Sequence, residues 1–448
     1  MSTTCSQKKD ISTPKSTATT FLQTKAQRYL QPLEAKLLAQ IDKRLVATFA
    51  TLFTSILLFR NSKMGLLLSE LGSYITGYAH APAGTKRLSN LLRSKKWDAS
   101  LIEDFFFKRT LERITQLQEA QRRPLLLWDD SRIEKPESWF VEGLCSVESS
   151  KGKRLTKIKK GFFKPPTARI CVPGFHWTAL LLSALGEVPS VCQMSWWTTR
   201  GKYKEVGTNL MFRMLKKLQA CLDQPLLHVL DRGYASAWTI EWMLHFKQDF
   251  LLRWKKNHLL VHAQKGTKQT HLLARSCKAQ SHKLLRDNQR KLTKHISVGW
   301  LAVHHPGFTH QDLFLVVVRD KKGLQPPMYL LTSVAIKTVK DAWAMAHSYM
   351  HRWQIEQAFR AGKAELGMES PRLWLWETRL KLLGVVALVY DFLLTLLRTW
   401  SGWIPFLLKR WVPRTGNRHR TASVPIYRLR VAISNALMVV FAITQNSG

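Results

Sequence analysis

Two short apolar runs that end in acidic residues stand out in the hydropathy pattern of this chain. Residues 125–128 are Leu, Leu, Leu and Trp, and Asp129 and Asp130 follow them; residues 226–230 form a second apolar stretch, which Asp231 follows. Continuous apolar runs of this length predict buried strands. Each would deliver an acid at its end. The other segments that the pattern predicts as strands of the same sheet are 139–148, 177–191 and 250–254.

Helical spacing dominates the ends of the chain. Residues 24–120 carry apolar positions at helical intervals, and the segments 209–222 and 237–245 do so between the predicted strands. From 255 to 333 the pattern changes to short β-like pieces divided by Gly and Pro. Long apolar helices are expected over 373–400 and 426–444.

Residues 349–363 predict an amphipathic helix, because no Pro interrupts them and Ala-rich sequence precedes them. At 100° per residue, Tyr349, Arg352, Glu356 and Lys363 fall within about 40° of one direction. A neighbouring face is apolar and should point to the core; its members are Ala346, Met350, Trp353, Ala361 and Ala364. Taken alone, the polar stripe is equally well explained as a solvated face with an Arg352–Glu356 pair.

Composition points to a polyanionic partner. The 448 residues include 69 Lys and Arg against 30 Asp and Glu, a net charge of +39, while 45% apolar content favours packed cores over disorder. The strongest apolar runs, 45–59 and 382–397, are shorter than the about 20 residues that span a bilayer. We therefore expect nucleic acid as the partner and no membrane.

Neither the cysteines nor the N-terminus adds further chemistry. The six Cys residues lack any C-x-x-C pair, which favours reduced thiols and argues against a zinc site. Residues 1–25 are rich in Ser, Thr and Lys and predict a flexible tail. No apolar segment follows the early lysines, so a secretory signal is not expected and a cytoplasmic location is.

The spacing Tyr349, two residues, Arg352, three residues, Glu356, six residues, Lys363 resembles the signature around the last catalytic acid of DDE insertion-sequence transposases. The resemblance requires two upstream aspartates at strand ends, and Asp129 and Asp231 supply them. An Asp-Arg-Gly run such as 231–233 is similar to the one that holds the family's second acid.

This resemblance implies an α/β fold with a ribonuclease H-like core, a β-rich insertion and a preceding all-α domain. The expected segments are a flexible tail (1–25), a helical DNA-binding domain (26–120), the first part of the catalytic core (121–254), the β-rich insertion (255–334), the second part of the core (335–400) and a C-terminal helical region (401–448). Within the helical domain, the basic segment 85–96 is expected either to dock on DNA or to be a solvated face.

The implied activity is cleavage of transposon ends and joining of the 3′ hydroxyl to target DNA. Asp129, Asp231 and Glu356 would hold two divalent ions, Mg²⁺ or alternatively Mn²⁺, because a set of carboxylates without His or Cys suits hard cations. Asp130 competes with Asp129 as the first acid, since successive strand residues point to opposite faces. Ser131, two residues after Asp129, is similar to the hydroxyl residue that the family often carries there.

Several basic residues are expected to contact double-stranded DNA. They are Arg352 and Lys363 beside Glu356, together with Tyr349; Arg232 beside Asp231; and Lys157, Lys159 and Lys160 in the basic stretch 151–164. That stretch can also be explained as a solvated loop. A homodimer is expected in the DNA complex because two ends must be joined. The alternatives are an inactive DNA-binding protein derived from a transposase and a stand-alone metal-dependent nuclease.

Overall fold

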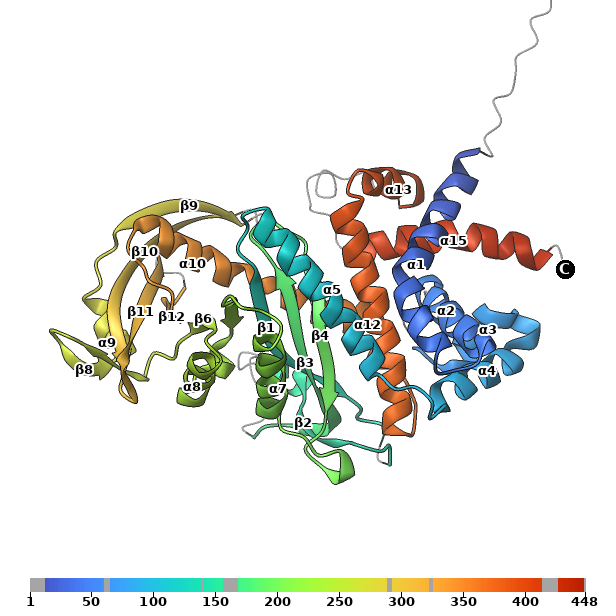
Figure 1. Ribbon diagram of the computed structural model, residues 1–448, viewed down its shortest axis with the longest axis horizontal. Helices are drawn as coiled ribbons and strands as arrows, with labels where there is room; N and C mark the ends of the chain where they lie inside the picture. Colours follow the sequence, from blue (N-terminus) through green and yellow to red (C-terminus); the bar gives the residue numbers. More distant parts are fainter. Residues whose placement is uncertain are drawn as a thin grey trace, which may run out of the picture. The chain divides into compact units, whose positions relative to one another are not determined.

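The computed structural model describes residues 13–59, 65–138, 140–155, 168–287, 292–321, 325–412 and 426–446. Its compact units are two: residues 1–105 with 361–448, which is helical, and residues 106–360, which contains the sheet. The chain is thus a mixed α/β protein with an all-α N-terminal region. Figure 1 shows the elements of both units.

Helices from both ends of the chain build the helical unit. They are α1 (Thr13–Leu38), α2 (Lys43–Leu58), α3 (Leu68–Thr76), η1 (Tyr78–His80), α4 (Ala81–Arg93), the start of α5 (Ser100–Glu119), the π-helical turn η4 (Ala361–Glu365), α12 (Trp376–Thr399), α13 (Trp403–Trp411) and α15 (Ile426–Asn446). Tyr29 in α1 donates a 2.9 Å hydrogen bond to Asp391 in α12. The N-terminal and C-terminal segments therefore share one core.

The predicted flexible tail is wrong for residues 13–25, which belong to α1. Ala18, Leu22, Leu30, Leu33 and Leu37 are buried at helical spacing. Ala18 and Leu22 thus share one buried face with the later leucines of α1. Burial of such a face is the main source of helix stability in proteins.

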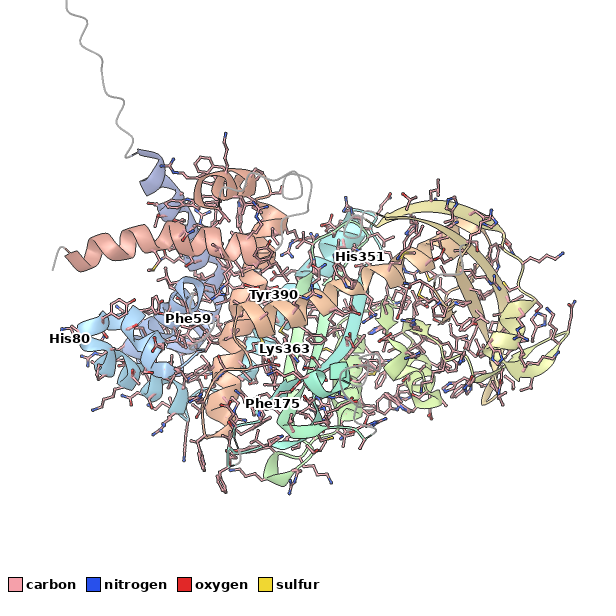
Figure 2. The ribbon with its side chains drawn as sticks, turned by 180° about the vertical axis from the view of Figure 1, so that it is seen from behind. Phe59, His80, Phe175, His351, Lys363 and Tyr390 are labelled. Atoms are coloured by element: carbon pink, nitrogen blue, oxygen red, sulfur yellow. The ribbon has the colours of Figure 1, made fainter. Side chains whose placement is uncertain are left out.

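The structure also divides the helical and catalytic segments at other positions than predicted. The structure divides the chain after 105 and after 360, inside the segments predicted as 26–120 and 335–400. The reason lies in α12, which is apolar on all sides and needs helices around it; its neighbours include α2, α4 and α15. Tyr390, labelled in Figure 2, is 1% exposed within this core.

Among the described residues, one helix, α12, is long and apolar enough to cross a membrane. In its most apolar window, 89% of the residues are buried inside the protein. Core helices of this kind pass the same test of length and composition, so α12 is weak evidence for a membrane span.

A mixed twelve-stranded sheet forms the centre of the second unit. Its strands are β1 (Leu125–Glu134), β2 (Cys145–Glu148), β3 (Cys171–Ser183), β4 (Ser190–Trp197), β5 (Leu227–Leu230), β6 (Asp249–Arg253), β7 (Leu259–His262), β8 (Gly266–Gln269), β9 (Ser281–Asp287), β10 (Leu292–His305), β11 (Phe308–Asp320) and β12 (Met328–Thr332). The helices of this unit are α6 (Ser150–Leu155), η2 (Gly201–Tyr203), α7 (Gly207–Gln219), η3 (Arg232–Tyr234), α8 (Ala237–His245), α9 (Thr270–Arg275), α10 (Val339–His351) and α11 (Trp353–Arg360).

Strand order places β1 in the middle of the first half of the sheet. β4 and β2 pair with β3, β3 is antiparallel to β1, and β5 and β6 continue parallel to β1. The predictions for β5, β6, α7 and α8 are confirmed. The single strand predicted over 177–191 is wrong, because a turn with Gly186 at φ +78° separates β3 from β4. The prediction for 139–148 shortens to β2.

Residues 255–334 are β-rich, as predicted, but they extend the same sheet. β12 pairs antiparallel with β6, and β11 and β10 follow outward. An exposed β6 edge would leave backbone groups unpaired, and β12 satisfies them. Figure 1 shows α10 lying along β10 and β11.

Candidate active site

Asp129 and Asp231 come from neighbouring parallel strands. The register pairs Trp128 of β1 with Leu230 of β5, so each aspartate follows its paired residue. Asp231 lies just past the end of β5, as predicted. Asp129 does not end its strand, because pairing with β3 continues β1 to Glu134. The two carboxylates nevertheless stand at the same level of the sheet.

The adjacent acids Asp129 and Asp130 have different surroundings. Asp130 accepts hydrogen bonds from Thr178 at 2.5 Å and from Tyr234 at 2.8 Å. Asp129 instead accepts a 2.8 Å hydrogen bond from Arg352. This is the alternation that a strand imposes on successive side chains. Thr178 and Tyr234 therefore each bind one oxygen of Asp130. Asp129 instead contacts Arg352, which also pairs with Glu356.

Three residues of the α10–α11 segment reach these acids. α10 begins with a capping box between Thr338 and Asp341. Near its end, Tyr349 donates a 2.8 Å hydrogen bond to Asp231. Arg352 contacts Asp129 through Nη1 and forms an i,i+4 ion pair with Glu356 through Nη2. Tyr349 and Arg352 thus connect Asp129, Asp231 and Glu356.

The predicted single helix over 349–363 is wrong in its geometry. α10 ends at His351, Arg352 caps it, and α11 runs from Trp353 to Arg360 before the π-helical turn η4. Met350, predicted on the apolar face, is 37% exposed. Arg352 keeps α-region φ and ψ and still pairs with Glu356 four residues later, whereas the π-helical turn η4 departs from the uniform 100° step.

Burial and charge oppose each other at Asp129. Burial raises its pKa, the positive charge of Arg352 lowers it and the negative charge of Asp231 raises it, which together leave the pKa at about 7. At Asp231, burial also raises the pKa, but Arg352, the backbone N–H of Arg232 and the Tyr349 hydroxyl outweigh it and leave the pKa lowered. The two acids therefore differ: burial dominates at Asp129, whereas positive charge and hydrogen bonds dominate at Asp231.

The chemistry of these donors fits hard divalent cations. All three side chains offer carboxylate oxygens, which Mg²⁺ and Mn²⁺ prefer. Burial is the main cause of the raised pKa of Asp129, and the negative charge of Asp231 adds to it. Within the described part of the chain, however, no three potential ligands gather into a metal cluster. Arg352 contacts one oxygen of Asp129 and one oxygen of Glu356.

The other predicted site residues lie in different settings. Arg232 is exposed in η3, directly after Asp231. Lys363 lies in η4 of the helical unit, where it pairs with Glu369 at 3.2 Å. Lys157, Lys159 and Lys160 fall outside the residues that the structure describes.

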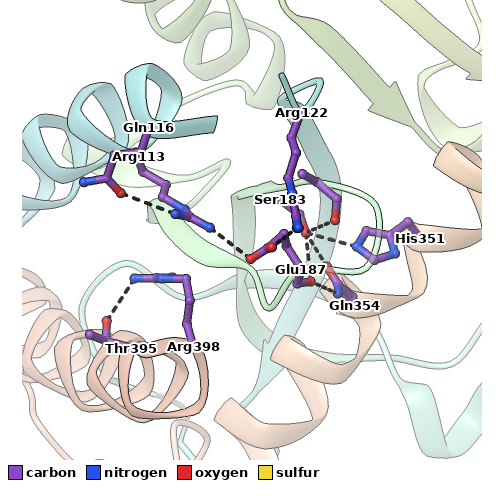
Figure 3. A network of polar contacts seen from close by, with 10 residues as sticks. Arg113, Gln116, Arg122, Ser183, Glu187, His351, Gln354, Thr395 and Arg398 are labelled. Carbon is purple, nitrogen blue, oxygen red and sulfur yellow. Dashed lines mark hydrogen bonds and ion pairs between the residues drawn. The ribbon is translucent and has the colours of Figure 1, made fainter. Parts of the chain in front are cut away.

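A polar network that the sequence analysis did not identify holds the α10–α11 junction (Figure 3). Gln354 donates to the backbone carbonyl of Glu187 at 2.9 Å and accepts from Ser183 at 2.8 Å. The Ser183 hydroxyl also lies 3.1 Å from Nε2 of His351. These contacts fix the residues on both sides of Arg352 to the β3–β4 turn.

Two arginines in turn hold the Glu187 carboxylate. Arg113 lies 3.0 Å from one oxygen, and Arg122 contacts the other. The sequence offered one signal for the network, namely polar His351 and Gln354 next to the signature residues. It did not indicate their partners, which are 167 to 171 positions away.

Comparison with known proteins gives one family match. Residues 208–392, which include Asp231, Tyr349, Arg352 and Glu356, match the model of the transposase DDE domain. No curated protein matches the chain. Among solved structures, the cryo-EM structure of piggyBac transposase synaptic complex with hairpin DNA covers 91% of this chain and 73% of its own, with 12% identity and a TM-score of 0.42.

Proposed function

We propose that this chain is a DDE transposase that cleaves transposon ends and joins the freed 3′ hydroxyl to target DNA. The observation that carries the proposal is the connection of three carboxylates through one arginine and one tyrosine. Asp129 and Asp231 come from adjacent parallel strands, and Glu356 comes from a late helix. The transposase DDE domain match over 208–392 supports the same reading.

The proposed core is ribonuclease H-like. The strand order β4-β3-β1-β5-β6, with β3 antiparallel and β5 and β6 parallel to β1, supports this assignment. In the proposal, the first acid is on the central strand, the second follows the neighbouring parallel strand, and the third is on a helix. This arrangement brings together acids that are separated by more than two hundred residues in sequence.

Asp129, Asp231 and Glu356 would hold Mg²⁺ or Mn²⁺. The ions would activate the attacking oxygen and neutralise charge on the leaving 3′ oxygen. Tyr349 orients Asp231 through its hydrogen bond, and Arg352 holds Asp129 and Glu356 until substrate enters. Once released, the Arg352 guanidinium can pair with a DNA phosphate through two parallel hydrogen bonds.

Double-stranded DNA is the proposed partner, and the charge of +39 supports it. The exposed basic side chains of α4, which include Lys86, Arg87 and Arg93, are proposed to contribute to end binding. Lys157, Lys159, Lys160 and Lys363 are proposed as further phosphate contacts. A homodimer on DNA and a cytoplasmic location complete the proposal.

The test is incubation of the protein with Mg²⁺ and a duplex that carries the DNA flanking its gene. The proposal predicts cleavage at defined ends, followed by covalently joined products with a target plasmid. Cleavage without joining would favour a stand-alone nuclease. Binding without cleavage, unchanged in Asp231→Asn, would favour a DNA-binding protein that has lost its activity.

A further inference from the structure

A large basic cavity lies beside the candidate active site within the sheet unit. Its volume is about 960 Å³, at the upper end of the range for ligand pockets. Among the described residues, six cationic side chains line it, and no Asp or Glu does. We call it the basic cavity; its cations are Arg232, Arg253, Lys255, Lys256, Arg275 and Arg319.

The cations project from anchored backbone. The N–H of Trp254 donates to the carbonyl of Tyr329 at 2.8 Å, which joins the end of β6 to β12. Both the backbone N–H and the ring Nδ1 of His271 approach the carbonyl of Lys256, at 3.1 and 3.0 Å. The backbone that carries Lys255 and Lys256 is thereby fixed to α9.

The cations of the basic cavity lack direct ion-pair partners in the described part of the chain. None of its six cations forms an ion pair there, although Arg319 donates to the backbone carbonyl of Ala274 at 2.5 Å. Several like charges around one cavity repel one another, and that repulsion disfavours the folded state. A ligand with several negative charges would remove the cost.

The basic cavity is electrostatically joined to the candidate acids. Arg232 directly follows Asp231, and Arg253 stands beside Asp231 because the parallel register pairs the preceding residues, Leu252 of β6 and Leu230 of β5. A strand with its scissile phosphate at Asp231 would therefore find the next phosphates drawn towards these cations. The partly exposed ring of Tyr329 adds aromatic surface to the wall.

We propose that the basic cavity binds the phosphate backbone of a single DNA strand next to the scissile phosphate. This inference rests on the proposed function, because it takes DNA as the substrate. A concave site with cations and aromatic side chains is the usual form of single-strand binding sites. A cavity of about 960 Å³ has room for a short stretch of one strand.

Fluorescence anisotropy with a labelled oligothymidylate in EDTA tests the proposal without requiring cleavage. Lys255→Gln/Lys256→Gln/Arg275→Gln removes three charges, and the affinity should fall at least tenfold. The slope of log K against log salt should decrease by about 2, at about 0.7 per phosphate contact in single strands. Lys256→Gln/Arg275→Gln, which changes two exposed residues, should decrease it by about 1.4.

The matched control is Lys108→Gln/Lys204→Gln/Lys216→Gln, which removes three charges from exposed lysines of the same unit outside the cavity. Its slope should change by much less. Equal slopes for the cavity and control variants would overturn the proposal. So would displacement of the oligonucleotide by inorganic tripolyphosphate at equal phosphate concentration, which would indicate a site for small polyphosphates.

The two proposals fail separately. If the cavity variants lose single-strand binding but the wild type never cleaves DNA, the proposed role of the cavity is supported and the proposed transposase activity is contradicted. If the wild type cleaves DNA but the cavity variants bind the single strand as well as the wild type does, the transposase activity is supported and the role of the cavity is contradicted.

Discussion

Arg352 and Asp129 lie 223 residues apart in sequence, yet Nη1 of Arg352 donates a 2.8 Å hydrogen bond to Oδ2 of Asp129. The same guanidinium pairs with Glu356. With 8% of the Arg352 side chain and 19% of the Asp129 side chain exposed, the pair is largely shielded from water. The contact between strand and helix thus lies at the centre of the candidate site.

The surroundings of the adjacent acids predict that Asp129→Asn and Asp130→Asn differ in kind. Asp129→Asn should abolish Mg²⁺-dependent cleavage and leave the fold intact. Asp130→Asn weakens the hydrogen bonds from Thr178 and Tyr234 and should lower the free energy of unfolding by about 1–3 kcal/mol. Cleavage assays at low temperature and thermal unfolding separate the two effects. Full activity of Asp129→Asn with loss in Asp130→Asn would reverse the assignment.

A double-mutant cycle should detect coupling between Arg352 and Asp129. Arg352→Gln leaves a buried carboxylate unpaired, so at pH 8 it should lower the free energy of unfolding by about 3 kcal/mol. Much of that loss should disappear when Asp129→Asn is already present. The control is Arg132→Gln, which breaks a more exposed pair with Glu148 and should cost less than about 1 kcal/mol. Additive effects at Arg352 and Asp129 would contradict the described contact.

The raised pKa of Asp129 predicts a pH dependence of stability. Burial raises this pKa from 3.8 to about 7, so between these values the folded protein binds more protons than the unfolded chain. The contribution of Asp129 to stability is therefore fully present below about pH 4 and is lost as the pH rises through about 7. Asp129→Asn removes the titration.

Thermal unfolding of wild type and Asp129→Asn from pH 4 to pH 8 measures this effect. Relative to the variant, the wild type should lose up to about 4 kcal/mol over the range. Added Mg²⁺ should reduce the loss if the acids bind it. Parallel stability curves for the two proteins would show that Asp129 does not titrate in this window.

The Glu187 network predicts that Gln354 acts as a positioning residue. Gln354→Ala removes its bonds to Ser183 and to the Glu187 carbonyl, which hold the junction beside Arg352. Turnover in the cleavage assay should fall about tenfold, while DNA affinity should stay within about twofold of wild type. The matched control is Gln193→Ala, which loses a comparable amide bond to Ser195 on β4. Equal effects of the two variants on turnover would reduce Gln354 to a structural role.

The sequence predicted elements best where one short pattern sufficed. Apolar runs before Asp129 and Asp231 located β1 and β5. The spacing from Tyr349 to Glu356 identified the side chains that contact these acids or pair with Arg352. The contacts of Asp130 with Thr178 and Tyr234 depend on strand pairing, which no local pattern encodes. The prediction for Lys363 assumed a regular α-helix, whereas the chain forms a π-helical turn at 361–365.

The basic cavity could not be predicted from the sequence. Its cations come from η3, β6, the β6–β7 connection, α9 and β11, and they are spread over about ninety positions. In a chain with 69 Lys and Arg, such a set has no distinguishing local signal. The pairing of β12 with β6 brings these segments together, and that pairing follows from the whole sheet.

Comparison of wild type with Glu356→Gln in paired binding and cleavage assays tests the central claim most directly. The variant keeps the shape of the side chain but removes the charge that would hold a metal ion. With Mg²⁺ and the flanking-gene duplex, the account predicts that cleavage falls by orders of magnitude while the gel-shift affinity for the same duplex is retained. Cleavage by Glu356→Gln at the wild-type rate would contradict the assignment of the catalytic site.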